Sequence, residues 1–167
     1  LSFSFWVKLD NHTDTNLRYV FKAKDSGTTT CSIYFESNQL HFAIANQTYA
    51  GKLYEWDITM SNFTTWTNVI ISWDGNFNGM TAILYINGVS QGTSDTTDSS
   101  PNSGQRRKWD TFSLFDIDNS ATDKELQGSL QEFAIYNKQL DVTDVSEVYN
   151  NGKYFNLLGA TSKNNIL

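Results

Sequence analysis

Two aspartates separated by one residue, Asp116 and Asp118, form the pair in this sequence best suited to hold a cation. Both enter a polar loop that continues with Asn119 and Asp123, so carboxylate, amide and backbone oxygens could gather around one ion. Oxygen ligands of this kind are the ones that Ca²⁺ prefers. The pattern predicts a calcium site at Asp116, Asp118, Asn119 and Asp123, and a solvated acidic turn is the alternative.

A second set of residues has the chemistry for binding sugars. An aromatic ring can stack on the apolar face of a sugar, while planar polar or charged groups bond its hydroxyls. We predict ligand contacts by Trp109, Trp56, Tyr49, Arg106 and Arg107. For Trp109 the alternative is a ring that anchors its loop by packing into the core.

Other reactive residues indicate structure rather than chemistry. Residues 74–79 read Asp-Gly-Asn-Phe-Asn-Gly, the first half of a calcium loop, but Tyr85 stands where the bidentate glutamate belongs. A hairpin turn explains that segment better. The histidines His12 and His41 have no nucleophile motif near them, and Cys31 is the only cysteine, so no internal disulfide can form.

The composition restricts the class of protein. The chain has 167 residues, 39% of them hydrophobic, and a net charge of -6, which indicates one folded domain and argues against nucleic-acid binding. No apolar run approaches the roughly 18 residues of a membrane span, so membrane insertion is not expected. The sequence begins inside a strand pattern at Leu1, so we expect residues 1–167 to be a single domain excised from a longer chain.

Short strands must position these residues. Apolar side chains alternate with polar ones from Leu1 to Leu9, the period of a half-buried strand. Glycine-bearing and polar turns separate the apolar runs, whereas residues 91–110 have no apolar period and are predicted to form a long loop. The predicted strands are Leu1–Leu9, Leu17–Phe21, Cys31–Glu36, Leu40–Ala45, Gly51–Met60, Thr67–Trp73, Met80–Ile86, Thr111–Asp116 and Leu126–Tyr136.

One short helix is predicted near the C-terminal end, over Val142–Tyr149. Asp141 is placed as its N-cap, Asp144 occupies the capping-box position, and Gly152 is expected to supply the left-handed C-terminal cap. About nine short strands with one proline and many polar turns favour an all-β sandwich or barrel. A single short helix on a sandwich is expected to close an open edge or end of its core.

Three segments in this order resemble the laminin-G-like, concanavalin A-like lectin/glucanase family. Ser2–Lys8 resembles its opening strand, residues 66–75 with 84–88 resemble its central hairpin, and residues 128–140 resemble its closing strand. The resemblance implies an antiparallel two-sheet jelly-roll sandwich with one short C-terminal helix. It also assigns Trp6 and Trp66 to packing positions, and calcium-dependent relatives use carboxylates near Asp116. A further opening strand, usual in the family, is missing here.

The resemblance includes glycoside hydrolases, which carry Glu-x-Asp-x-(x)-Glu on one strand. Here Glu55 and Asp57 begin the pattern, but Thr59 stands where the second glutamate belongs. A hydroxyl cannot serve as the acid–base carboxyl near neutral pH. The sequence therefore predicts a protein that is not an enzyme.

The expected function is a recognition or adhesion module that binds glycans or a surface protein. It would belong to a secreted, cell-surface or virion-surface protein and act beside other domains of its parent chain. Two alternatives remain: a purely structural domain that decorates a larger assembly, and an accessory domain of a glycoside hydrolase.

Overall fold

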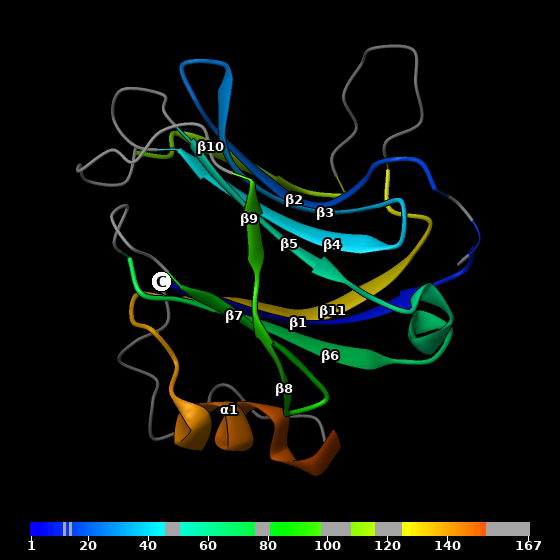
Figure 1. Cartoon of the computed structure of the whole chain (residues 1–167). Coiled ribbons are helices and arrows are strands. Elements are labelled where there is room, and N and C mark those ends of the chain that lie inside the picture. Colours follow the sequence, from blue (N-terminus) through cyan, green and yellow to red (C-terminus); the bar gives the residue numbers. More distant parts are fainter. Residues whose placement is uncertain are drawn as a thin grey trace.

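The computed structural model describes residues 1–11, 13, 15–45, 51–75, 81–97, 108–115 and 125–152. Over these ranges the chain forms two antiparallel sheets that face each other (Figure 1). Sheet A consists, in spatial order, of β11 (Gly128–Tyr136), β1 (Ser2–Leu9), β6 (Thr67–Trp73), β7 (Ala82–Ile86) and β8 (Val89–Thr93). Sheet B consists of β10 (Thr111–Leu114), β2 (Arg18–Asp25), β3 (Thr28–Glu36), β4 (Gln39–Ala45), β5 (Gly51–Asp57) and β9 (Asp95–Thr97).

The alternation predicted for the first strand places its apolar side chains between the two sheets. Phe3, Phe5 and Val7 of β1 are fully buried. The ring of Phe3 lies 5.4 Å from that of Phe21 and 5.5 Å from that of Phe42, centroid to centroid, so one strand of sheet A contacts two of sheet B. Each such ring contributes about 1.5–3 kcal/mol through burial. This core confirms the two-sheet all-β sandwich.

Strand β9 and part of β8 lie in the region 91–110 that is predicted to be a loop. Every residue of β8, an edge strand of sheet A, is exposed, so neither of its faces requires apolar residues and no apolar period appears. Its pairing follows from the two-residue turn before it, in which Asn87 and Gly88 have φ of 49° and 75°. Two positive φ values are the signature of a tight hairpin turn.

Helix α1 (Val142–Tyr149) has the predicted bounds, and its first turn has the predicted capping box. The Asp141 side chain accepts a hydrogen bond from the Asp144 backbone, and the Asp144 side chain accepts one from the Asp141 backbone. The left-handed C-cap is Asn150, at φ 46°, rather than the expected Gly152. No helix in the described ranges has the length and apolar character that crossing a bilayer requires.

The position of α1 differs from the one expected. The helix covers the outer face of sheet A instead of closing an edge or an end of the core (Figure 1). Its buried residues Val145 and Val148 pack in a cluster with outward-facing residues of the sheet, among them Ile70, Tyr85 and Ala134. Sheet A is therefore buried on both faces where the helix lies, and its outer face can form a site together with the helix.

Two serines on the outer face of sheet A hold the segment that leads into α1. Ser2 Oγ donates to the carbonyl of Lys138 at 2.9 Å and accepts from the Leu140 backbone at 3.0 Å. Ser72 Oγ donates to the carbonyl of Leu140 at 2.7 Å. These bonds tie β1 and β6 to the start of the helix and so fix where its far end, Tyr149, reaches the sheet.

Candidate ligand-binding site

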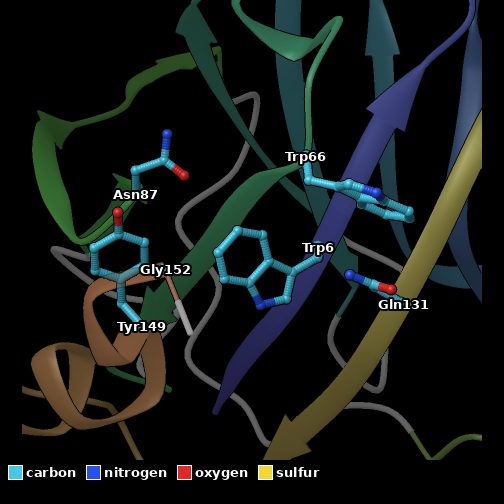
Figure 2. Close-up of a pocket in the computed structure, with 6 residues that line it drawn as sticks. All are labelled: Trp6, Trp66, Asn87, Gln131, Tyr149 and Gly152. Carbon is cyan, nitrogen blue, oxygen red and sulfur yellow. The ribbon is translucent and has the colours of Figure 1, made fainter. Parts of the chain in front are cut away.

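A cavity of about 280 Å³ opens on the outer face of sheet A beside the end of α1. This volume lies just below the roughly 300–1,000 Å³ of ordinary small-molecule sites. The described residues that line it are aromatic, amide or glycine, and none of these carries a formal charge: Trp6, Trp66, Asn87, Gln131, Tyr149 and Gly152 (Figure 2). We call this the Trp6 pocket.

The sheet register brings the amides of the Trp6 pocket to its tryptophan. Trp6 on β1 pairs with Gln131 on β11 and with Asn68 on β6, so the three side chains share the outer face. Asn87 is held beside them, because its backbone N–H donates to the Asn68 carbonyl and its Oδ1 accepts from the Asn68 backbone, both at 2.9 Å. The Asn87 amide is therefore fixed at the rim by the hairpin that it helps to form.

Tyr149, at the last turn of α1, forms one wall of the Trp6 pocket. Its ring stacks on that of Trp6 with a centroid separation of 6.0 Å and an interplanar angle of 28°. It also rests on the β7–β8 turn, where a Cβ added to Gly88 would lie 2.6 Å from Tyr149 Cδ1. Only glycine allows the turn and the ring to approach so closely.

Trp66, which precedes β6, supplies an exposed ring. In Figure 2, Trp6 lies at the centre, with Tyr149 and Asn87 on one side and Trp66 and Gln131 on the other. Trp66 is 37% exposed, whereas Trp6 is 7% exposed. The arrangement presents one accessible indole above a concave surface that is aromatic at its centre and carries amides at its edge.

Two buried polar atoms next to Trp6 lack hydrogen-bond partners within the described part of the chain. They are Nε2 of Gln131, a donor, and Oδ1 of Asn68, an acceptor. Leaving a buried donor or acceptor unpaired costs about 1–3 kcal/mol, so such groups in a folded protein call for an explanation. Gln131 lines the cavity, which makes a bound ligand one source of the missing acceptor.

Both tryptophans that the sequence suggested for ligand contacts pack against the core, and the ligand contacts themselves stay predictions. Trp56 is 4% exposed, its Nε1 donates to the Gly92 carbonyl at 3.4 Å, and its ring has almost no accessible face on which a sugar could stack. Trp109 is partly buried, with its ring 5.6 Å from that of Phe21 and 6.3 Å from that of Phe3. These contacts fit the alternative in which Trp109 anchors its loop.

Other predicted contacts lie outside the described residues. They are Tyr49, Arg106 and Arg107 for a ligand, and Asp116, Asp118, Asn119 and Asp123 for calcium. Both sets stay predictions. Within the described ranges, no three His, Cys, Asp or Glu side chains gather closely enough to hold a metal ion.

Most of the Trp6 pocket was not predicted from local sequence patterns. Trp6 and Trp66 were assigned to packing, and Gln131 and Asn87 had no predicted role. One signal was available: the alternation of β1 turns Trp6 away from the buried Phe3 and Phe5, toward the outer face. What covers that face depends on contacts distant in sequence, which local patterns do not contain.

The acidic residues of β5 do not form the carboxylate row of a glycoside hydrolase. The strand ends at Asp57, so Thr59 lies beyond it, at the cap of the 3₁₀ helix Met60–Phe63. Asp57 Oδ1 accepts a hydrogen bond from Gln39 Nε2 at 2.9 Å. Glu55 faces outward, with its Oε1 3.3 Å from Nδ1 of His41. The described residues therefore place no second glutamate on this strand.

His41 belongs to a cross-strand row on the outer face of sheet B. Its ring stacks on that of Tyr34, 4.5 Å away and within 5° of parallel. Burial lowers the pKa of His41, although the carboxylate of Glu55 opposes that shift. Burial, reinforced by the charge of Glu36, raises the pKa of Tyr34 to about 12. Both rings are therefore uncharged at neutral pH.

The two-sheet antiparallel sandwich with an aromatic-lined cavity on one outer face has the architecture of lectin-like jelly-roll domains. The match to known families agrees with that class. The chain belongs to the concanavalin A-like lectin/glucanases superfamily, whose family model matches residues 1–146. No curated protein matches the chain by sequence.

Solved structures with the same fold include binding domains of bacterial neurotoxins. The botulinum neurotoxin serotype D binding domain is 19% identical, with a TM-score of 0.62, covering 89% of this chain and 36% of that one. The receptor binding domain of the botulinum neurotoxin C/D mosaic serotype is 19% identical, with a TM-score of 0.62, covering 89% of this chain and 35% of that one. The botulinum neurotoxin serotype G binding domain is 16% identical, with a TM-score of 0.59, covering 89% of this chain and 35% of that one. The chain thus spans about a third of these domains, and the likeness concerns the fold.

Proposed function

We propose that this protein is a non-catalytic recognition module that binds carbohydrate in the Trp6 pocket. The observation that carries the proposal is the placement of the exposed Trp66 ring beside Trp6 and Tyr149, with the amides of Asn87 and Gln131 at the rim. Aromatic rings receive the apolar C–H face of a sugar, and planar amides can both donate to and accept from its hydroxyls. Membership of a superfamily that contains lectins supports this assignment.

The proposal extends to the setting of the domain. Solved relatives of the same fold are binding domains of larger toxins, which supports a binding domain within a longer, extracellular chain. A surface-protein ligand is the competing partner. It would need a larger contact area than the pocket offers, because specific protein interfaces bury roughly 800 Å² on each partner.

The test is a titration with a panel of saccharides, followed by tryptophan fluorescence and by calorimetry. We expect the wild-type chain to bind at least one saccharide, and Trp66→Ala to weaken that binding about tenfold or more, because stacking on the ring contributes up to about 1.5 kcal/mol in addition to buried area. Phe112→Ala is the matched control, since Phe112 is an aromatic residue, 67% exposed, on β10 of the other sheet.

Outcomes separate the candidate functions. A fold that survives Trp66→Ala while saccharide binding is lost supports the proposal. Equal weakening by Trp66→Ala and Phe112→Ala would contradict a site at the Trp6 pocket. Failure of every saccharide to bind would favour a protein partner or a structural role in an assembly.

A further inference from the structure

We propose that the Trp6 pocket takes a neutral saccharide and that Gln131 is its specificity-determining residue. The inference rests on the proposed carbohydrate-binding function and adds the class of sugar and the residue that selects it. It starts from strand β11, where the backbone departs from regular alternation.

A β-bulge in β11 turns Gln131 toward the Trp6 pocket. Ser4 pairs with Ala134, but the next outward residue of β1, Trp6, pairs with Gln131 rather than with Glu132. Glu132 has a φ of 51°, the left-handed region that few residues other than glycine adopt. Regular alternation from Ala134 would direct residue 131 into the core, so the extra residue is what brings the amide to the outer face.

Gln131 is the rim amide with a buried, unpaired donor. The Oδ1 of Asn87 already accepts a hydrogen bond from the Asn68 backbone, which holds that side chain against the hairpin. Nε2 of Gln131 is buried against the pocket and has no hydrogen-bond partner among the described residues. Gln131 lines the cavity, so a sugar hydroxyl bound there can supply the acceptor that this donor lacks. A site that leaves a buried polar group unpaired without its ligand rejects analogues that lack the matching hydroxyl.

The charges around the Trp6 pocket favour an uncharged sugar. No described lining residue carries a formal charge, and the chain has a net charge of -6. A carboxylate or sulfate on the ligand would therefore lose hydration without gaining a cation among these residues. The cation on the same face of β1, Lys8, is exposed and does not line the cavity. A Lys8→Ala variant therefore tests whether this exposed cation contributes to binding.

The experiment compares neutral saccharides with their sialylated or sulfated counterparts, for example lactose with 3′-sialyllactose, by calorimetry on the 167-residue chain. The variants are Gln131→Leu, Lys8→Ala and, as a matched control, Gln127→Leu, which removes an exposed amide just before β11. We expect neutral sugars to bind best, with an affinity that changes less than about twofold between about 50 mM and about 500 mM NaCl.

Gln131→Leu should reduce the ratio of affinities between the best neutral sugar and its epimers about tenfold, whereas Lys8→Ala and Gln127→Leu should leave that ratio within about twofold. Circular dichroism and thermal melts of each variant establish that it is folded. A change in selectivity with the fold intact is a readout that a merely structural role of Gln131 would not give.

Three results would overturn the inference. Preferential, salt-sensitive binding of charged glycans that depends on Lys8 would refute the neutral class. Unchanged selectivity in Gln131→Leu would refute the role of Gln131. In both cases loss of binding in Trp66→Ala would leave the proposed function standing, whereas failure of every saccharide to bind would overturn both.

Discussion

The close approach of Gly88 to Tyr149 gives a quantitative prediction about the wall of the Trp6 pocket. In Gly88→Ala the new Cβ would lie 2.6 Å from Tyr149 Cδ1, so the ring must retreat by about 0.8 Å to reach the 3.4 Å of ordinary contact. Gly27→Ala is the matched control, because Gly27 has a similar φ of 81° but nothing within 4 Å of the added Cβ. Both variants share the strain of a left-handed alanine, about 1 kcal/mol, and only Gly88→Ala adds overpacking.

Overpacking of this kind typically destabilises by about 1–3 kcal/mol. We therefore expect Gly27→Ala to lower the free energy of unfolding by about 1 kcal/mol and Gly88→Ala by about 2–4 kcal/mol, measured by urea denaturation. Displacement of Tyr149 from Trp6 should also weaken saccharide binding about two- to twelvefold, since aromatic pairs are worth about 0.5–1.5 kcal/mol. Gly27→Ala should leave the affinity unchanged.

A double-mutant cycle shows whether the contact is the cause. In a Tyr149→Ala background the ring is gone, so Gly88→Ala should become as mild as Gly27→Ala. Equal destabilisation by Gly88→Ala and Gly27→Ala in the wild-type background would refute the argument. So would a Gly88→Ala effect that persists in full without the Tyr149 ring.

Two further predictions concern stability. In Gly128→Ala the new Cβ would lie 2.2 Å from the backbone carbonyl of Lys8, which cannot move without separating β11 from β1, so we expect a loss of at least about 3 kcal/mol in urea unfolding. Gly51→Ala, where the nearest atom is a carbonyl at 3.5 Å, should be nearly neutral, and comparable losses in both would contradict the explanation. For His41 the folded pKa is lowered, so the unfolded chain binds the proton first and stability falls as the pH drops below about 6.5. The free energy of unfolding should decline less in His41→Gln than in wild type between about pH 7.5 and about pH 5.5, and parallel declines would show that His41 is not responsible.

Local patterns predicted the elements whose causes are local. The alternation in Leu1–Leu9 required a strand with Phe3 and Phe5 on one face, and the aspartates at 141 and 144 required a helix start; both are confirmed. The edge strand β8 escaped prediction because exposure removes the apolar period. Trp56 packs into the core, because the alternation that turns Glu55 outward turns its ring inward.

The Trp6 pocket depends on a feature that the sequence does contain, although not as a strand pattern. Leu130 and Phe133 both pack on the core, yet they are three residues apart, an odd spacing that regular alternation cannot place on one face. The bulge at Glu132 resolves the conflict, and its consequence is that Gln131, which follows Leu130, faces outward opposite Trp6. The requirements of the core thus fix the backbone of the site but do not by themselves require glutamine at position 131. Variation at that position could therefore change the ligand without changing the fold.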